Sequence, residues 1–289
     1  MLQKAVRFLK RQQALSRINL SLSRAATTSQ LRNINPKKPN SWEFAGFSQN
    51  GEDGISDYLT QNLLSPNRYF FEIGAADGLE NNTSWFAIAK KYSGLMIEGD
   101  KKLSKRLDQL ISGFNLGVTV QQQFVTVDNI PSLVNSLQYQ DPDFFSLDID
   151  GNDYYILEAL LENKLRPKII IVEYNSAYGP DNAQTIPYDE SFYYLDAHAS
   201  GLYYGVSIQA WQTLLCSKNY QFITVDANGV NAIFVDKSAF APEFLAGIKP
   251  KYFAENFYQF KKYGSWDKQY QKICHLPFNK IKNIKETAA

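Results

Sequence analysis

Phe71-Glu-Ile-Gly-Ala-Ala-Asp-Gly78 is the stretch that decides the fold of this chain. The apolar run that leads into it predicts a buried β-strand over residues 69–75, followed by a helix that starts near Asn82. Glycine allows the backbone to turn tightly and a ligand to approach closely. In an open parallel sheet, ligands bind beyond the carboxyl ends of the strands. The loop over residues 74–78 is therefore the expected cofactor site.

Strand-like and helix-like runs alternate after this stretch. Further strands are expected over 95–99, 118–125, 144–150 and 168–174, with helices that start near Lys101, Pro131 and Asn152. This alternation predicts an α/β fold with a doubly wound, mostly parallel sheet. After a helix over 206–218, strands over 220–225 and 232–235 flank Asp226-Ala-Asn-Gly229, a turn typical of β-hairpins. We therefore expect a C-terminal antiparallel hairpin at the end of the sheet.

The charge of the loop distinguishes between two cofactor classes. A dinucleotide requires Gly-x-Gly-x-x-Gly around its pyrophosphate, but Ala76 stands at the third position and the carboxylate of Asp77 would repel phosphates. S-adenosylmethionine carries a sulfonium and an ammonium, both positive, and suits Glu72 and Asp77. The predicted cofactor-binding residues of this loop are Glu72, Gly74, Ala75, Asp77 and Gly78. A strand–helix turn without a ligand is the structural alternative.

Two further acidic motifs follow at the expected strand ends. Glu98, 20 residues after Gly78, is predicted to bind the ribose hydroxyls of the cofactor, whereas Asp100 suits the N-cap of the next helix. Asp148 and Asp150 share one strand face if the strand continues that far, and like charges so close require a neutralising partner. A divalent metal, the sulfonium or a substrate proton would each serve, and Asp148 is predicted to bind the cofactor. Asn152 is expected to bind substrate, or to cap the helix that follows.

The fifth strand ends in Val172-Glu-Tyr-Asn175. Glu173 and Asn175 point polar groups toward the same crevice and are predicted to bind substrate. With Asp150, Glu173 could instead complete a site of oxygen ligands for a hard divalent cation. The sequence leaves both interpretations open.

These motifs together resemble the FkbM family of S-adenosylmethionine-dependent methyltransferases. Besides the stretches above, the resemblance includes Ser48-Gln-Asn-Gly-Glu-Asp-Gly54, Asn82-Thr83, Tyr204-Gly-Val-Ser207 and Asn231-Ala-Ile-Phe-Val235. It covers about residues 44–236. The family implies a seven-stranded class I methyltransferase sheet and transfer of a methyl group to a hydroxyl, often on a sugar or a secondary metabolite.

A hydroxyl nucleophile needs a group that takes its proton. Asp150 is the first candidate for this base and His198 the second. The segment 174–204 is rich in tyrosine, including Tyr178, and aromatic rings with hydroxyl tips suit a glycan or another polyhydroxylated acceptor. Packing within this segment itself is the alternative role for these tyrosines.

Composition sets the remaining expectations. Residues 1–40 hold nine of the 30 Lys and Arg residues and no acidic residue, so residues 41–289 hold 21 basic and 29 acidic residues. A body with this balance would repel nucleic acid. Two cysteines make no disulfide framework, and no run reaches the length of a membrane span. A cytoplasmic protein is expected, with residues 1–40 as its only candidate for contact with a membrane surface or a protein.

The expected domains are a basic arm (1–40), partly helical or disordered, a Rossmann-like methyltransferase domain (41–236) and a helical, aromatic extension (237–289) packed on it. The leading hypothesis is an O-methyltransferase that acts on a sugar, a glycan or a secondary metabolite. An NAD-dependent oxidoreductase on a similar sheet and a catalytically inactive, methyltransferase-like binding module are the alternatives.

Overall fold

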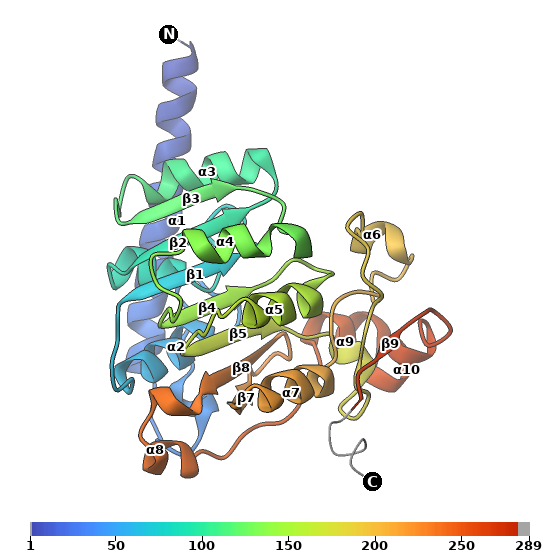
Figure 1. The fold of residues 1–289 in the computed structure, drawn as a ribbon. Coiled ribbons are helices and arrows are strands. Elements are labelled where there is room, and N and C mark those ends of the chain that lie inside the picture. The colour runs from blue at the N-terminus through green and yellow to red at the C-terminus, as the bar shows by residue number, and fades with distance from the viewer. Residues whose placement is uncertain (1, 283–289) are drawn as a thin grey trace.

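The computed structural model describes residues 2–282, in which one seven-stranded sheet organises the chain (Figure 1). Its strands are β1 (Tyr69–Ile73), β2 (Ser93–Glu98), β3 (Val118–Gln122), β4 (Phe144–Leu147), β5 (Ile169–Glu173), β7 (Tyr220–Val225) and β8 (Asn231–Asp236). The strand order is β3-β2-β1-β4-β5-β8-β7. The first five strands are parallel to one another, and β8 is antiparallel to both β5 and β7. The predicted doubly wound sheet with its C-terminal hairpin is confirmed.

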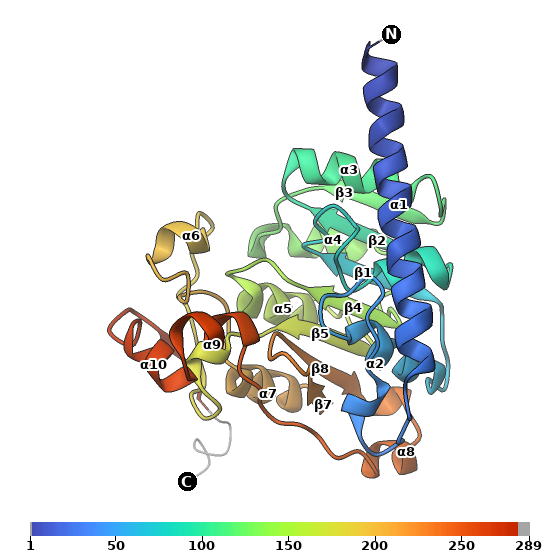
Figure 2. The same cartoon turned by 180° about the vertical axis from the view of Figure 1, so that it is seen from behind.

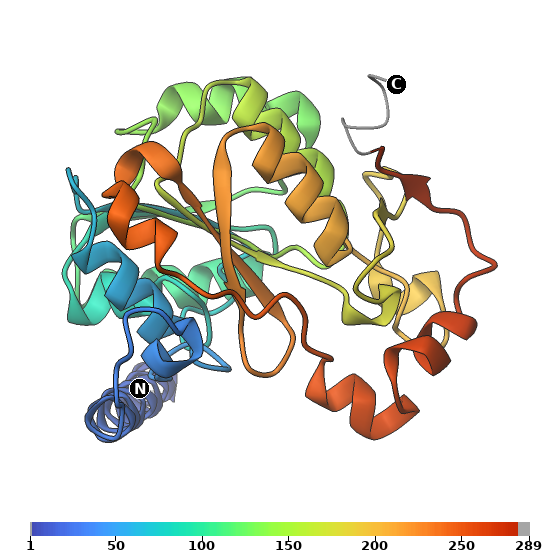
Figure 3. The same cartoon turned by 90° about the horizontal axis from the view of Figure 1, so that it is seen from below.

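Helices cover both faces of the sheet, as Figure 3 shows from below. The described helices and helical turns are α1 (Leu2–Gln30), η1 (Pro39–Trp42), α2 (Glu52–Gln61), η2 (Trp85–Ala89), α3 (Lys101–Ile111), η3 (Val127–Asn129), α4 (Ile130–Ser136), α5 (Asp153–Glu162), η4 (Ser176–Tyr178), α6 (Tyr194–Ala197), α7 (Ile208–Ser217), η5 (Lys237–Ala239), α8 (Pro242–Ala246), α9 (Phe257–Tyr263) and α10 (Trp266–Gln271). The helix expected near Asn82 is reduced to the short turn η2.

Successive side chains along each strand pack into two different hydrophobic cores, one on each face of the sheet. Phe71 and Phe145 face one core together with α4, α5 and α7, whereas Phe70 and Phe144 face the other together with α2 and α3. Successive side chains of a strand point to opposite faces, so an unbroken apolar run buries both faces of the sheet. These two cores hold the strand ends in place, and the strand ends carry the site.

The N-terminal segment, expected to be a partly helical or disordered arm, is helical over most of its length. It is one long helix, α1, whose second half lies along the domain beside α2 (Figure 2). Ile18 and Ala25 are buried there, and Arg24 donates hydrogen bonds to the carbonyls of Gly46 and Ser48. An apolar face used for packing inside the chain is not free to lie on a lipid surface.

The segment that follows β5 and the C-terminal extension pack on each other. Ala177, Tyr178 and Leu202 form a small third core with Ile273, and β6 (Gln184–Thr185) pairs with β9 (Asn279–Lys280). Both segments gather at the side of the sheet where the parallel strands end (Figure 1). Among residues 2–282, none of the helices combines the length and the apolar character that crossing a bilayer requires.

Candidate functional site

A cavity of about 820 Å³ lies beyond the carboxyl ends of the parallel strands. Gly74 after β1, Glu98 at the end of β2 and Asp148 after β4 line it from the sheet, and Tyr188 and Tyr194 line it from the segment after β5. These strands are neighbours in the order β2-β1-β4, so their ends meet at one edge. The fold thus brings together motifs that lie as far apart in the sequence as residues 72 and 150.

Gly74 allows the first strand to end against its neighbour. Its φ is +88°, and a Cβ at this position would lie 1.7 Å from the carbonyl oxygen of Asp148. A side chain would therefore collide with the backbone of the next strand end. The glycine of the motif is required both by its backbone conformation and by this close approach.

Glu72 is buried beneath the loop and is held by hydrogen bonds. Its carboxylate accepts from the side-chain amide of Asn81 (2.9 Å), the backbone N–H of Asn82 (3.3 Å) and the hydroxyl of Thr83 (2.5 Å). Burial raises the pKa of Glu72 to about 8, against the opposing effect of these donors. A cation in the cavity would favour the charged form of this carboxyl.

Glu98 stands at the tip of β2, where the sequence placed it. Its two oxygens accept hydrogen bonds from the backbone N–H groups of Ala76 (2.8 Å) and Asp100 (2.7 Å). Partial burial raises its pKa. These bonds hold the carboxylate at the cavity wall, and Asp100 caps α3 as expected through the N–H groups of Lys102 and Leu103.

Over residues 2–282, the cavity wall carries acidic side chains and no basic ones. Its lining includes the seven carboxylates of Glu72, Glu80, Glu98, Asp100, Asp148, Asp150 and Glu190, and no Lys, Arg or His among the described residues. Polar amides and the apolar side chains of Ile97 and Leu103 complete the wall. Such a wall attracts a cationic ligand and repels a diphosphate.

Asp148, Asp150 and Glu173 form a cluster at the base of this wall. Each offers a carboxylate oxygen within 4.8 Å of the other two. Desolvation, followed by repulsion from neighbouring carboxylates, raises the pKa of Asp148 and Glu173 well above their ordinary values. Desolvation and the charge of Asp153 raise the pKa of Asp150 to about 6. The cluster therefore favours a bound proton, a cationic ligand or a hard divalent cation, for which carboxylate oxygens are suitable ligands.

The turn that presents Asp150 is held from below. Asp153 accepts hydrogen bonds from the N–H groups of Ile149 and Gly151, both at 2.9 Å. Asp150 itself has a φ of +56°, which is uncommon for a residue with a side chain. Asn152 donates to the carbonyl of Asp189 at 2.8 Å and so ties the turn to the segment that covers the cavity.

Three predicted cofactor residues face away from the cavity. Ala75 is buried, with its N–H bound to the carbonyl of Ile97, and a Cβ on Gly78 would meet Leu107 of α3 at 2.5 Å. Asp77 lies 3.6 Å from Arg17 of α1. None of the three lines the cavity, and their role as cofactor ligands remains a prediction.

Two predicted substrate residues are structural. Asn175 is buried and donates its side-chain amide to the carbonyls of Leu202 (2.7 Å) and Tyr204 (3.0 Å). Tyr178 is buried in the third core, and its hydroxyl donates to the carbonyl of Tyr204 at 2.7 Å. Both fold the segment after β5 and have no surface left for a substrate.

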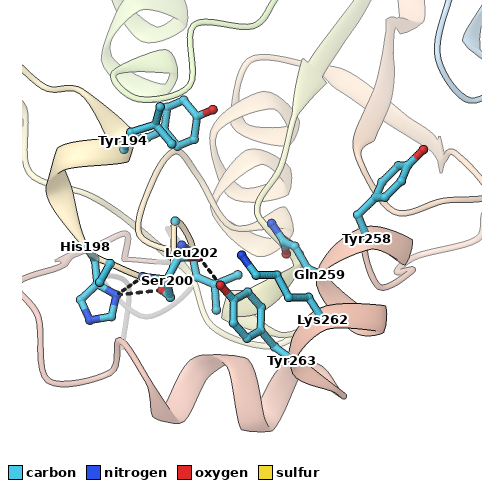
Figure 4. Close-up of a pocket in the computed structure, with 11 residues that line it drawn as sticks. Tyr194, His198, Ser200, Leu202, Tyr258, Gln259, Lys262 and Tyr263 are labelled. Carbon is cyan, nitrogen blue, oxygen red and sulfur yellow. Dashed lines mark hydrogen bonds between the residues drawn. The ribbon is translucent and has the colours of Figure 1, made fainter.

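His198, the second candidate base, does not reach the carboxylate cluster. It lines a separate pocket beside α9, where its Nδ1 lies 2.8 Å from the hydroxyl of Ser200 (Figure 4). The reason is the fold of α6, which carries this part of the segment outward. Asp150 is therefore the candidate base that the structure places in the cavity.

Comparison with known families identifies the matched part of the chain. Residues 89–222 match the model described as the methyltransferase FkbM domain, a range that includes Glu98, Asp148, Asp150 and Glu173. The chain carries an FkbM methyltransferase domain. The expected family is confirmed, and with it the enzyme class, an S-adenosylmethionine-dependent methyltransferase.

The FkbM methyltransferase is also similar to solved structures. One is an O-methyltransferase from Bacillus cereus in complex with SAH (18% identity, 76% of this chain and 90% of that chain, TM-score 0.42). Another is the O-methyltransferase TomG from Streptomyces achromogenes, involved in tomaymycin synthesis, in complex with SAM (13% identity, 75% and 89%, TM-score 0.44). At these identities and scores, neither similarity decides the function of this chain. A search of curated proteins finds no match to it.

Sequence reasoning missed several residues that line the cavity of the FkbM methyltransferase. Residues 123–126, just after β3, form one wall, and Gln49 reaches the cavity from the loop before α2. Asp53, in the first turn of α2, holds that loop by accepting three hydrogen bonds from the N–H groups of residues 46–48 (2.8, 2.6 and 2.9 Å). The position of residues 123–126 at the end of a strand was the available signal for the first wall.

Proposed function

We propose that this FkbM methyltransferase transfers a methyl group from S-adenosylmethionine to a hydroxyl of a sugar, a glycan or a secondary metabolite. The single observation that carries the proposal is the cavity wall of seven carboxylates without a basic residue. It suits a donor with a sulfonium and an ammonium, and it disfavours the diphosphate of NAD. The oxidoreductase alternative requires a phosphate-binding loop that this wall does not offer.

Donor binding is assigned to the ends of the first two strands. Gly74 leaves room for the donor against the end of β1, and Glu98 has its carboxylate fixed at the wall by two backbone N–H groups. Carboxylates at the end of a second strand accept ribose hydroxyls in related nucleotide sites. Residues 123–126 of the neighbouring wall, with Phe124 and Val125, supply apolar surface for the adenine ring.

Proton removal is assigned to Asp150. In the transfer, the acceptor oxygen bonds to the methyl carbon, the bond from that carbon to sulfur breaks, and the hydroxyl proton passes to a base. A base is most effective when its pKa lies near the working pH. The pKa of Asp150, raised to about 6 by desolvation and by Asp153, meets this requirement better than that of an ordinary aspartate. In-line alignment of oxygen, carbon and sulfur supplies the rest of the catalysis.

The acceptor is assigned to the side of the cavity formed by the segment after β5. Tyr188, Phe192, Tyr193 and Tyr194 line it there, and Phe192 lies within contact distance of Gly151 beside the proposed base. Aromatic faces with polar tips bind polyhydroxylated molecules well. This supports a sugar or a similar metabolite over a purely apolar acceptor.

The carboxylate cluster also fits a divalent cation, held by Asp148, Asp150 and Glu173. Such a cation would lower the pKa of the acceptor hydroxyl. We favour a shared proton, because the raised pKa values let the cluster hold its proton without a metal. Activity in the presence of a chelator decides between the two.

Residues 1–40 were expected to contact a membrane surface or a protein, and we propose contact with a protein. The second half of α1 packs on the domain through Ile18 and Ala25, so its apolar face is already used. Arg17 of this half stays half-exposed beside Asp77 and keeps a positive charge at the surface. We retain a cytoplasmic location as a proposal with it.

Labelled methyl transfer tests the proposed function. Purified protein, radiolabelled S-adenosylmethionine and a panel of saccharides and cell extracts would be incubated, and products would be identified by mass spectrometry. The expected result is an acceptor that gains one methyl group on oxygen, with loss of transfer in Asp150→Asn. An inactive binding module would bind S-adenosylhomocysteine and transfer nothing to any acceptor.

A further inference from the structure

A second pocket, of about 330 Å³, lies beside the main cavity (Figure 4). One wall is the segment 194–202, and the other is α9 with Tyr258, Gln259, Lys262 and Tyr263. The hydroxyl of Tyr263 donates to the carbonyl of Ser200 at 2.7 Å, which fastens the two walls together. The pocket is thus built by residues 194–202 and by α9, two segments that belong to neither core of the sheet.

The second pocket has the opposite charge to the main cavity. Lys262 and His198 line it, and no Asp or Glu does so among the described residues. Over residues 2–282, no carboxylate lies within 4.0 Å of the Lys262 ammonium. This ammonium lies 4.8 Å from the centre of the Tyr263 ring, and Lys272 approaches the same ring at 5.7 Å. Anionic groups are therefore attracted to this pocket and repelled by its neighbour.

The two cavities are adjacent. Tyr194 lines both of them. The hydroxyl of Tyr204 accepts a hydrogen bond from Gln259 (3.1 Å), in the wall of the second pocket, and donates one to Glu173 (3.4 Å), in the carboxylate cluster. One tyrosine hydroxyl thus links the wall of the second pocket to the carboxylate cluster, and the two cavities share Tyr194.

The rim of the second pocket is aromatic and exposed. Tyr258 is 74% exposed and Leu195 is 55% exposed, although both are large and apolar. An exposed tyrosine ring next to a cation is a suitable surface for a sugar ring that carries an anionic substituent, because the ring stacks while the charge pairs.

We propose that the second pocket is the acceptor's distal subsite, and that Lys262 selects a sugar with an anionic group such as a carboxylate or a phosphate. The anion lies against Lys262, and the hydroxyl to be methylated lies at Asp150. This inference rests on the proposed function, since it names the class of acceptor for the same site.

Isothermal titration calorimetry tests the subsite on protein saturated with S-adenosylhomocysteine. The probes are 4-nitrophenyl β-D-glucuronide and 4-nitrophenyl β-D-glucoside, which differ in one carboxylate. We expect the glucuronide to bind about fivefold more tightly, the effect of one exposed charge pair. Lys262→Gln should remove this preference, whereas Lys261→Gln, on the same helix but outside the lining, should keep it.

Equal affinities for the two probes, binding of neither probe, or a preference that survives Lys262→Gln would overturn the subsite. Repetition with glucose 6-phosphate against glucose distinguishes a phosphate from a carboxylate as the preferred anion. Failure of the proposed function would be separate: the protein would not bind S-adenosylhomocysteine, while the preference for the anionic sugar would still depend on Lys262.

Discussion

Replacement of Gly74 by alanine tests whether the loop after β1 is built for a ligand and for its neighbour. Gly74 has a φ of +88°, and a Cβ there would lie 1.7 Å from the carbonyl oxygen of Asp148. A left-handed conformation costs an L-residue about 1–2 kcal/mol. The collision with a packed strand end adds about 1–3 kcal/mol, because either the loop or the end of β4 must move.

Gly205→Ala is the matched control for this change. Gly205 also has a positive φ (+63°), but its added Cβ would meet nothing within 4 Å. The control therefore carries the backbone strain without the collision. In thermal unfolding, we expect Gly205→Ala to lower Tm by about 2–4 °C and Gly74→Ala to lower it by roughly 6–12 °C.

The decisive readout is affinity for S-adenosylhomocysteine, measured by titration calorimetry. Displacement of the loop should weaken binding in Gly74→Ala by about tenfold or more, since ~1.4 kcal/mol of misfit is enough for a factor of ten. Gly205→Ala should bind as the parent does. If both variants keep the parental affinity and have equal Tm values, the loop is not the cofactor site and the reasoning is refuted.

Three further predictions concern the carboxylates. Asp150→Asn should lower kcat by about 10²–10⁴ with little change in the affinity for S-adenosylhomocysteine. In the parent, kcat should rise with pH through about 6 and then level, because a base works in its deprotonated form. An unchanged kcat in the variant would exclude Asp150 as the base. The raised pKa of Glu72, about 8, means that its protonated form stabilises the folded state fully at pH values below the ordinary pKa of glutamate, and that this contribution is lost as pH rises through about 8. The Tm of the parent should therefore fall over this range, and Glu72→Gln should reduce that fall. Identical profiles of Tm against pH for the two proteins would contradict this prediction. EDTA should leave methyl transfer unchanged, whereas a loss that Mg²⁺ restores would place a cation on Asp148, Asp150 and Glu173.

The sheet could be predicted because its signals are local. Apolar runs that end in Gly or in acidic residues mark the parallel strands, and the Asn-Gly turn marks the hairpin, so the parallel sheet and its antiparallel end follow from general rules. The carboxylates at the ends of β1, β2 and β4 could be predicted for the same reason. Parallel neighbours end at one edge, and that edge is where ligands bind.

The remaining residues could not be predicted because tertiary contacts decide them. Asn175 and Tyr178 have polar groups suited to a substrate, yet both bind the carbonyl of Tyr204, a contact created by the return of the chain after β5. His198 is carried outward by α6, whose course depends on packing against the C-terminal extension. The packed face of α1 includes the small residues Ala14 and Ala25, which give a weak apolar signal.

Titration of the purified protein with S-adenosylmethionine, S-adenosylhomocysteine and NAD tests the central claim most directly, namely that the wall of carboxylates selects a cationic donor. The account predicts saturable binding of the first two ligands, weakened in Glu98→Gln, and no binding of NAD under the same conditions. Tight binding of NAD, or S-adenosylmethionine affinity that is indifferent to Glu98, would contradict it.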